Sequence, residues 1–163
     1  MKRVSEGLSV LALCAATAFA GDPVQGIALY KDARYAEAEA ALRGAPGGEA
    51  RAYLAAALER LDRHAEAEAE AKAVLEVEAT QPVALAALGE SLVKQEKLDE
   101  AVSRMTAALG REATLAYAYY WRGQAYQRKK QIARMVDDFQ HFMKLAPDAP
   151  EAPAIKVLLA SLK

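Results

Sequence analysis

Apolar and small residues along this chain recur at helical spacing, and the pattern repeats with a period of 34 residues. When the sequence is shifted by 34, apolar positions fall on apolar positions. The matched pairs are Leu54 with Leu88, Leu58 with Leu92, Ala67 with Ala101, Leu85 with Tyr119, Gly89 with Gly123, Leu92 with Tyr126, Leu98 with Ile132, Met105 with Phe139 and Ala108 with Phe142. Three units in one register predict a stack of similar helix pairs, each burying its apolar face against its neighbours.

Local signals set the expected helix bounds. Asp22 and Pro23 form an N-cap followed by proline at the first helical position. The stretch RYAEAEAALR at 34–43 echoes DRHAEAEAEAK at 62–72 with a spacing of 29 residues, so we expect the first unit to have a shortened second helix. The expected helices are 23–31, 35–43, 49–60, 64–77, 82–94, 98–110, 115–128 and 132–145. A ninth helix begins near Pro153, with an apolar stripe of Ile155, Leu158, Leu159 and Leu162.

The spacing resembles the tetratricopeptide repeat (TPR) family, whose signature is W-x2-L-G-x2-Y, then A-x3-F, then proline. The last unit carries it as Tyr119, Arg122, Gly123, Tyr126, Met135, Phe139 and Pro147, and the middle unit as Leu85, Leu88, Gly89, Leu92, Ala101 and Met105. An earlier unit has Leu54, Ala55, Leu58, Ala67 and Ala71, but departs from the signature at Arg51. The resemblance implies an all-α fold, a right-handed α-solenoid of antiparallel helix pairs. Its units would be 21–47 (truncated), 48–81, 82–115 and 116–149, with a C-terminal capping helix at 152–162.

Residues 1–20 have the features of a cleavable signal peptide. Lys2 and Arg3 precede a short apolar run, and Ala18-Phe19-Ala20 is a small-x-small cleavage site. Cleavage after Ala20 would remove Cys14, the only cysteine. The alternative is a bacterial lipoprotein signal ending at Cys14, but such signals prefer a small residue where Leu13 stands. We expect an exported protein, periplasmic or secreted, with no membrane insertion after cleavage.

Composition and motifs argue against several functions. The net charge of −1, with no basic run, gives no indication of nucleic-acid binding. The sequence has no catalytic or phosphate-binding motif, and we expect no enzyme activity, no cofactor and no metal site. His64 is expected to pack in a turn. His141 is expected on an outer face near Asp137 and Asp138, where a weak metal contact is the alternative. Glu66, Glu68 and Glu70 point in different directions around a helix and predict a solvated face.

Binding therefore remains as the expected activity. In the TPR family the first helix of each unit lines a concave surface that usually takes a peptide segment or a helix of another protein. The positions expected there are Ala52, Ala56, Glu59, Arg60, Val83, Ala86, Glu90, Val93, Lys94, Tyr117, Tyr120, Trp121, Gln124, Gln127 and Arg128. A clamp for a C-terminal carboxylate is disfavoured, because the chain has no asparagine and its groove cations are dispersed among Glu59 and Glu90.

The segment LAYAYYWRGQAY at 115–126 holds five of the aromatic residues. At 100° per residue, Tyr119 and Tyr126 fall on the face that matches the repeat signature and are expected in the core. Tyr117, Tyr120 and Trp121 fall on a second face, which is the predicted contact surface. The leading hypothesis is a protein-binding scaffold of the cell envelope. The alternatives are a structural subunit of an envelope assembly that uses its outer face, and an enzyme.

Overall fold

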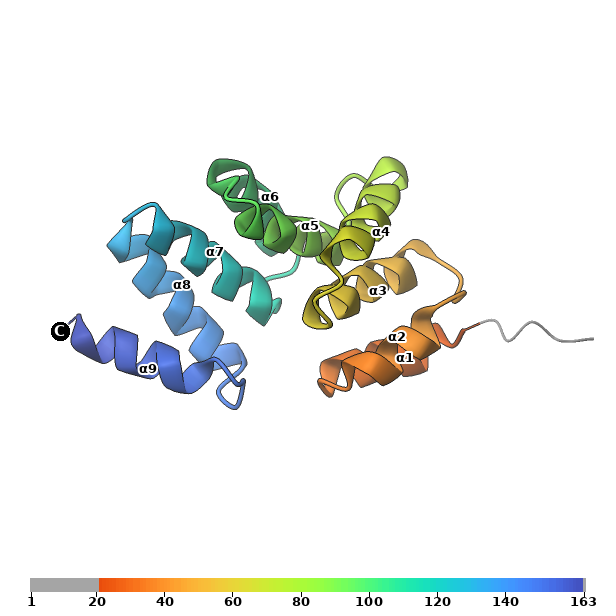
Figure 1. Ribbon diagram of the computed structural model, residues 1–163, viewed down its shortest axis with the longest axis horizontal. Helices are drawn as coiled ribbons and strands as arrows, with labels where there is room; N and C mark the ends of the chain where they lie inside the picture. Colours follow the sequence, from red (N-terminus) through yellow and green to blue (C-terminus); the bar gives the residue numbers. More distant parts are fainter. Residues whose placement is uncertain (1–20, 163) are drawn as a thin grey trace, which may run out of the picture.

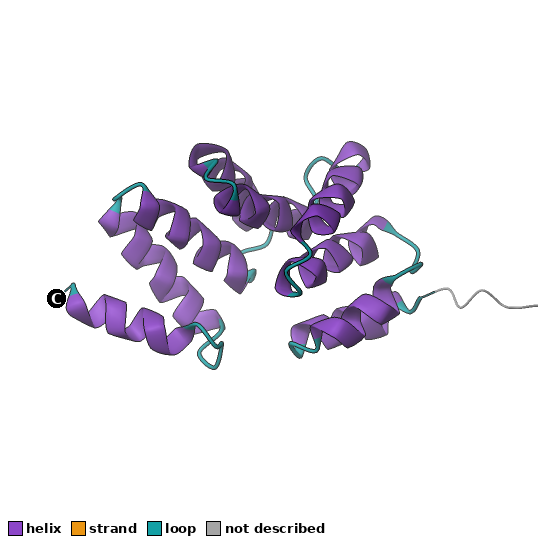
Figure 2. Ribbon diagram, viewed as in Figure 1, coloured by secondary structure: helices purple, strands orange, loops and turns teal. Residues whose placement is uncertain are grey.

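A computed structural model describes residues 21–162, and within them the chain forms nine helices and no strand (Figures 1 and 2). The helices are α1 Pro23–Lys31, α2 Tyr35–Leu42, α3 Gly48–Arg60, α4 His64–Val77, α5 Pro82–Lys94, α6 Leu98–Arg111, α7 Ala116–Arg128, α8 Ile132–Leu145 and α9 Ala152–Ser161. The expected helices are confirmed to within one residue at either end. The predicted signal peptide and Cys14 lie outside the described residues.

The turn inside each helix pair has the same backbone geometry in all four pairs. One residue adopts the left-handed conformation, with φ between 58° and 62°, at Ala33, Asp62, Glu96 and Lys130. The following amide donates a hydrogen bond of 2.9 Å to a carbonyl five residues earlier, as from Arg34 N to Leu29 O. The left-handed residues are spaced 29, 34 and 34 apart, which are the spacings of the sequence echoes.

Close packing between the two helices of a pair depends on a glycine of the first helix in three pairs, at Gly26, Gly89 and Gly123. A Cβ atom added to Gly89 would lie 2.7 Å from Met105 Cγ, and one added to Gly123 would lie 2.7 Å from Phe139 Cε1. Both partners are completely buried. This close approach offsets the helix-propensity cost of a mid-helix glycine, which is about 1 kcal/mol.

The capping helix α9 packs against α8. Ile155 is 4% exposed, while Leu158 and Leu159 are half-buried against the C-terminal part of the core. Leu162, the last residue of the apolar stripe, follows the end of α9 and is 46% exposed.

The helix pairs follow one another along an arch, with α1 and α2 at one end and α7 to α9 at the other (Figure 1). The first helices of successive pairs lie on the inside, where α3 packs against α5 and α5 against α7. The first pair is shortened, because α2 has 8 residues whereas α4, α6 and α8 have 14 each. Among residues 21–162, no helix has the length and apolar character needed to cross a bilayer.

Candidate functional site: the concave cleft

The inside of the arch holds two adjoining cavities of about 420 and about 790 Å³, which we call the concave cleft. Tyr35, Glu90, Tyr117 and Trp121 line both cavities. One wall comes from α1, α2 and their turn, and the opposite wall comes from α7 and the connection between α8 and α9. These volumes fall within the range of pockets that bind ligands.

Three tyrosines form the N-terminal wall of the cleft. The ring centroid of Tyr30 lies 5.6 Å from that of Tyr35 and 5.3 Å from that of Tyr53, the second pair in an edge-to-face arrangement. Burial raises the pKa of Tyr30, so its hydroxyl remains protonated and able to donate a hydrogen bond. Aromatic clusters of this kind combine a large apolar area with polar hydroxyls.

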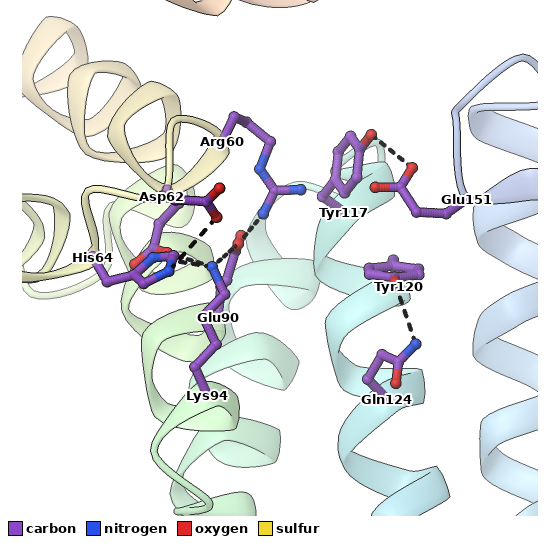
Figure 3. Close-up of polar contacts among 10 residues, drawn as sticks. Arg60, Asp62, His64, Glu90, Lys94, Tyr117, Tyr120, Gln124 and Glu151 are labelled. Carbon is purple, nitrogen blue, oxygen red and sulfur yellow. Dashed lines mark hydrogen bonds and ion pairs between the residues drawn. The ribbon is translucent and has the colours of Figure 1, made fainter.

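Tyr117 and Trp121 form the opposite wall. The Tyr117 hydroxyl donates a hydrogen bond of 3.1 Å to Glu151 Oε2, and the Arg60 guanidinium lies 4.4 Å from the Tyr117 ring centroid (Figure 3). Burial, with a smaller contribution from nearby negative charge, raises the pKa of Tyr117. The indole Nε1 of Trp121 is buried and has no hydrogen-bond partner within residues 21–162. It is a donor available to an acceptor on a ligand.

Beneath these walls lies a network of charged side chains from α3, α4 and α5 (Figure 3). Glu59 Oε2 accepts a hydrogen bond of 2.9 Å from Lys94 Nζ and lies 2.8 Å from His64 Nδ1. Lys94 Nζ also donates to Glu90 Oε1 at 2.9 Å, and Arg60 forms an ion pair with Glu90. Burial raises the pKa of Glu90, and the charges of Arg60 and Lys94 oppose this rise without cancelling it.

The structure brings nine of the predicted contact residues to the cleft and leaves six outside it. Those that line the cavities are Ala56, Glu59, Arg60, Val83, Ala86, Glu90, Lys94, Tyr117 and Trp121. Those that line neither cavity are Ala52, Val93, Tyr120, Gln124, Gln127 and Arg128. For Ala52 the reason is burial, because its side chain is completely inaccessible.

Tyr120 turns away from the cavities because it packs on the core of the last helix pair. Its ring centroid is 5.2 Å from that of Phe142, and its hydroxyl accepts a hydrogen bond of 3.2 Å from Gln124 Nε2. Arg128 joins neighbouring pairs, since its Nη1 donates to Val93 O at 2.8 Å and to Glu96 Oε1 at 2.7 Å. These contacts explain why Tyr120 and Arg128 do not line the cavities, and their contact with a partner stays a prediction.

Arg122 stands where the repeat signature has leucine, and it forms an ion pair with a side chain of α8. Its guanidinium binds the Asp138 carboxylate through two hydrogen bonds, Nε to Oδ2 at 2.9 Å and Nη2 to Oδ1 at 2.7 Å. Trp121, the preceding residue on α7, lines the cleft. Tyr126 is buried, as predicted, whereas Tyr119 is half-buried and stacks on the His141 ring with centroids 4.9 Å apart.

Sequence reasoning missed the three tyrosines Tyr30, Tyr35 and Tyr53. Tyr53 had a usable signal, since a shift of 34 residues places it on Ala87 and a second shift places it on Trp121. Ala87 and Trp121 both line the cleft. Tyr30 and Tyr35 belong to the truncated unit, where a register of 34 does not apply.

The other polar clusters noted in the sequence form structural contacts. Glu66 pairs with Arg63, and Glu68 pairs with Lys72 at 2.5 Å. The Nδ1 atom of His141 lies 2.9 Å from the carbonyl oxygen of Asp137. In the described part of the chain, no three His, Cys, Asp or Glu side chains are grouped in a way that suits a metal ion.

The arrangement of helices is similar to that of several solved TPR proteins. YrrB, a TPR protein with an unusual peptide-binding site, aligns with a TM-score of 0.54 and 22% identity over 80% of this chain and 70% of that chain. The Arabidopsis OM64 TPR domain gives 0.59 and 16% identity over 70% and 94%, respectively. The pilF protein of Pseudomonas aeruginosa gives 0.61 and 19% identity over 86% and 65%.

No protein-family model and no curated protein matches the sequence. At these identities the structural likeness establishes the fold. The chain adopts the TPR fold, an all-α solenoid of antiparallel helix pairs.

Proposed function

We propose that this protein is a scaffold that binds a segment of another protein in its concave cleft. The observation that carries the proposal is the cleft itself, with aromatic side chains on two facing walls and small side chains at Ala56, Ala86 and Ala87 between them. Small residues let a peptide backbone approach closely, and aromatic side chains dominate the energetics of many protein interfaces. The TPR fold supports this proposal, because an extended concave surface is the usual binding site of helical repeat arrays.

The unpartnered indole of Trp121 fits the same ligand. A peptide carries a carbonyl acceptor on every residue, and a buried donor without a partner is costly. A bound carbonyl oxygen would satisfy Trp121 Nε1. Because Trp121 is the only tryptophan of the chain, its fluorescence reports directly on the cleft.

The compartment is part of the proposal. The predicted signal peptide supports an exported protein that acts in the periplasm or outside the cell. The measurement is N-terminal sequencing of the protein recovered from the periplasmic fraction, which should begin at Gly21. A protein that retains Met1 and stays in the cytoplasm would contradict this assignment.

Two substitutions at exposed or half-exposed alanines test cleft binding. A photoreactive residue at position 86, on α5 inside the cleft, should crosslink a partner in the native cell. The same residue at position 69, on the exposed side of α4, serves as the control. Once the partner is identified, Ala86→Phe should block its binding by filling the cleft, whereas Ala69→Phe should leave the affinity unchanged. Crosslinking only from position 69, or full binding by Ala86→Phe, would place the partner elsewhere.

A further inference from the structure

We infer that the segment held in the concave cleft is basic, with lysine or arginine side chains that lie between the acidic rim and the tyrosine wall. This inference rests on the proposed function and specifies the chemistry of the partner. It comes from the balance of charges around the two cavities, from a buried carboxylate atom that lacks a partner, and from tyrosine faces that hold no cation.

The charges at the bottom of the cleft balance one another. Glu59 and Glu90 pair with Arg60 and Lys94, so these four side chains together contribute no net charge. Even so, Glu59 Oε1 is buried and has no hydrogen-bond partner among the described residues, in a side chain that lines the larger cavity. An unpartnered carboxylate oxygen favours a donor on the ligand.

The remaining charges of the cleft are mostly negative. Among residues 21–162, five further carboxylates line the cavities, whereas Lys31 is the one further cation that does so. The carboxylates are those of Asp32, Asp62, Glu112, Asp148 and Glu151, which together we call the acidic rim. None of the five forms an ion pair with a lysine or arginine of residues 21–162, and Asp62 approaches only His64, at 3.7 Å.

The acidic side chains surround the cavity from several directions. Asp32 lies on the turn after α1, Asp62 on the turn after α3, and Asp148 and Glu151 precede α9. Four of the five carboxylates line the larger cavity, so their negative potentials add together in the cleft. A cationic segment is attracted and an acidic segment is repelled, which also disfavours nucleic acid and anionic membrane surfaces as occupants.

The aromatic walls suit the same cations. Arg60 lies 4.4 Å from the ring centroid of Tyr117, and Lys94 lies 5.1 Å from that of Trp121. On the opposite wall, the half-buried Tyr30 and Tyr35 hold no lysine or arginine over their rings within the described chain. A ligand cation placed there gains the cation–π attraction that the protein's own cations gain on the other side.

The test measures binding of the purified chain to a positional-scanning library of acetylated, amidated nonapeptides without tryptophan. Binding is read by Trp121 fluorescence. We expect lysine or arginine to raise the affinity at least about fivefold over alanine at one or more positions, with glutamate lowering it. Raising NaCl from about 50 to about 500 mM should reduce this preference, because the rim charges are exposed to solvent.

The matched variants assign the preference to the rim. Asp32→Asn/Asp148→Asn removes two exposed carboxylates of the cleft and should reduce the preference for basic residues at least about threefold. Glu76→Gln/Glu78→Gln makes the same change in net charge on exposed residues at the end of α4 and should leave the preference intact.

The outcomes separate this inference from the proposed function. If Ala86→Phe abolishes binding but the protein prefers proline-rich or acidic peptides to basic ones, the inference of a basic segment is wrong and the cleft remains the binding site. Binding that Ala86→Phe does not affect, or the absence of binding to every peptide pool, overturns the cleft as the site. A preference for basic residues that falls equally in both carboxylate variants assigns it to the overall charge and overturns the role of the rim.

Discussion

Gly123→Ala is expected to destabilise the protein although alanine is the better helix former. Alanine in the middle of α7 gains about 1 kcal/mol of helix propensity. The new Cβ would lie 2.7 Å from Phe139 Cε1 and 2.8 Å from Cδ1, well inside ordinary van der Waals contact. Because the Phe139 ring is completely buried, it has no solvent-exposed position to move into. Overpacking of this kind costs about 1–3 kcal/mol, and we expect the upper end to apply here. The net loss in the free energy of unfolding is therefore about 1–2 kcal/mol.

Two other glycines provide the comparison. Gly110, near the end of α6, has nothing within 4 Å of an added Cβ, so Gly110→Ala should stabilise the protein by about 0.5–1 kcal/mol. Gly89→Ala should fall between the two, because its obstacle is the flexible side chain of Met105. The order of stability expected is Gly110→Ala, then Gly89→Ala, then Gly123→Ala.

The assay is urea denaturation followed by far-ultraviolet circular dichroism, with Trp121 fluorescence as a second probe. A double variant Gly123→Ala/Phe139→Leu isolates the contact, since the smaller side chain makes room for the new methyl group. We expect a favourable coupling energy of about 1 kcal/mol or more between the two substitutions. If Gly123→Ala is as stabilising as Gly110→Ala, α7 and α8 do not approach as described and the packing argument is wrong.

Three further predictions concern other contacts. Arg122→Ala leaves the buried Asp138 carboxylate without its partner and should cost about 3 kcal/mol or more, whereas Arg122→Leu/Asp138→Leu should recover most of this in the same denaturation assay. Lys130→Gly relieves the left-handed backbone at φ 58° and should stabilise the protein by about 0.5–1 kcal/mol, which thermal unfolding would show; a loss would mean that the Lys130 side chain matters more than its backbone. Burial raises the pKa of Glu39, but hydrogen bonds from two arginines outweigh it and leave the pKa below its ordinary value. A carboxylate whose pKa is lower in the folded state stabilises the fold at pH values above its unfolded-state pKa. This stabilisation is lost as the pH falls through the folded-state pKa. Glu39→Gln should therefore destabilise the protein at pH 7 but have little effect near pH 2, and an equal effect at both pH values would contradict the ion-pair explanation.

Much of the architecture could be predicted because it depends on local and repeating signals. Helix bounds follow from caps, proline and the 3.6-residue apolar period, which act within a few residues. Gly89 and Gly123 match in register, and a residue that is costly in a helix but recurs in register indicates a shared packing reason. In the second unit the positions that match Gly89 and Met105 are Ala55 and Ala71, and both are completely buried. Two small side chains therefore occupy the helix contact that a glycine and a large side chain occupy in the third unit.

The candidate site was predicted only in part. The 34-residue register shows which positions are equivalent, but it does not give the rotation of one helix pair relative to the next. The inner-helix positions of Ala86 and Tyr120 are equivalent in the repeat, yet Ala86 lines the cleft and Tyr120 packs against Phe142. Ala52 occupies the same position in the second unit and is fully buried. The three positions differ because their surroundings differ. Tyr120 packs in the hydrophobic cluster of the last helix pair, whereas Ala52 is buried in the cluster that the earlier pairs share.

The sequence by itself determined the helices, the helix pairs and the composition of their faces, because these depend on short-range propensity and on a period that the chain repeats. Tertiary structure alone decided which side chains face one another across the cleft. The curvature of the array accumulates from small rotations between units, and it brings the turn after α1 opposite the connection before α9. Tyr35 and Glu151, more than a hundred residues apart, come to line one cavity for that reason.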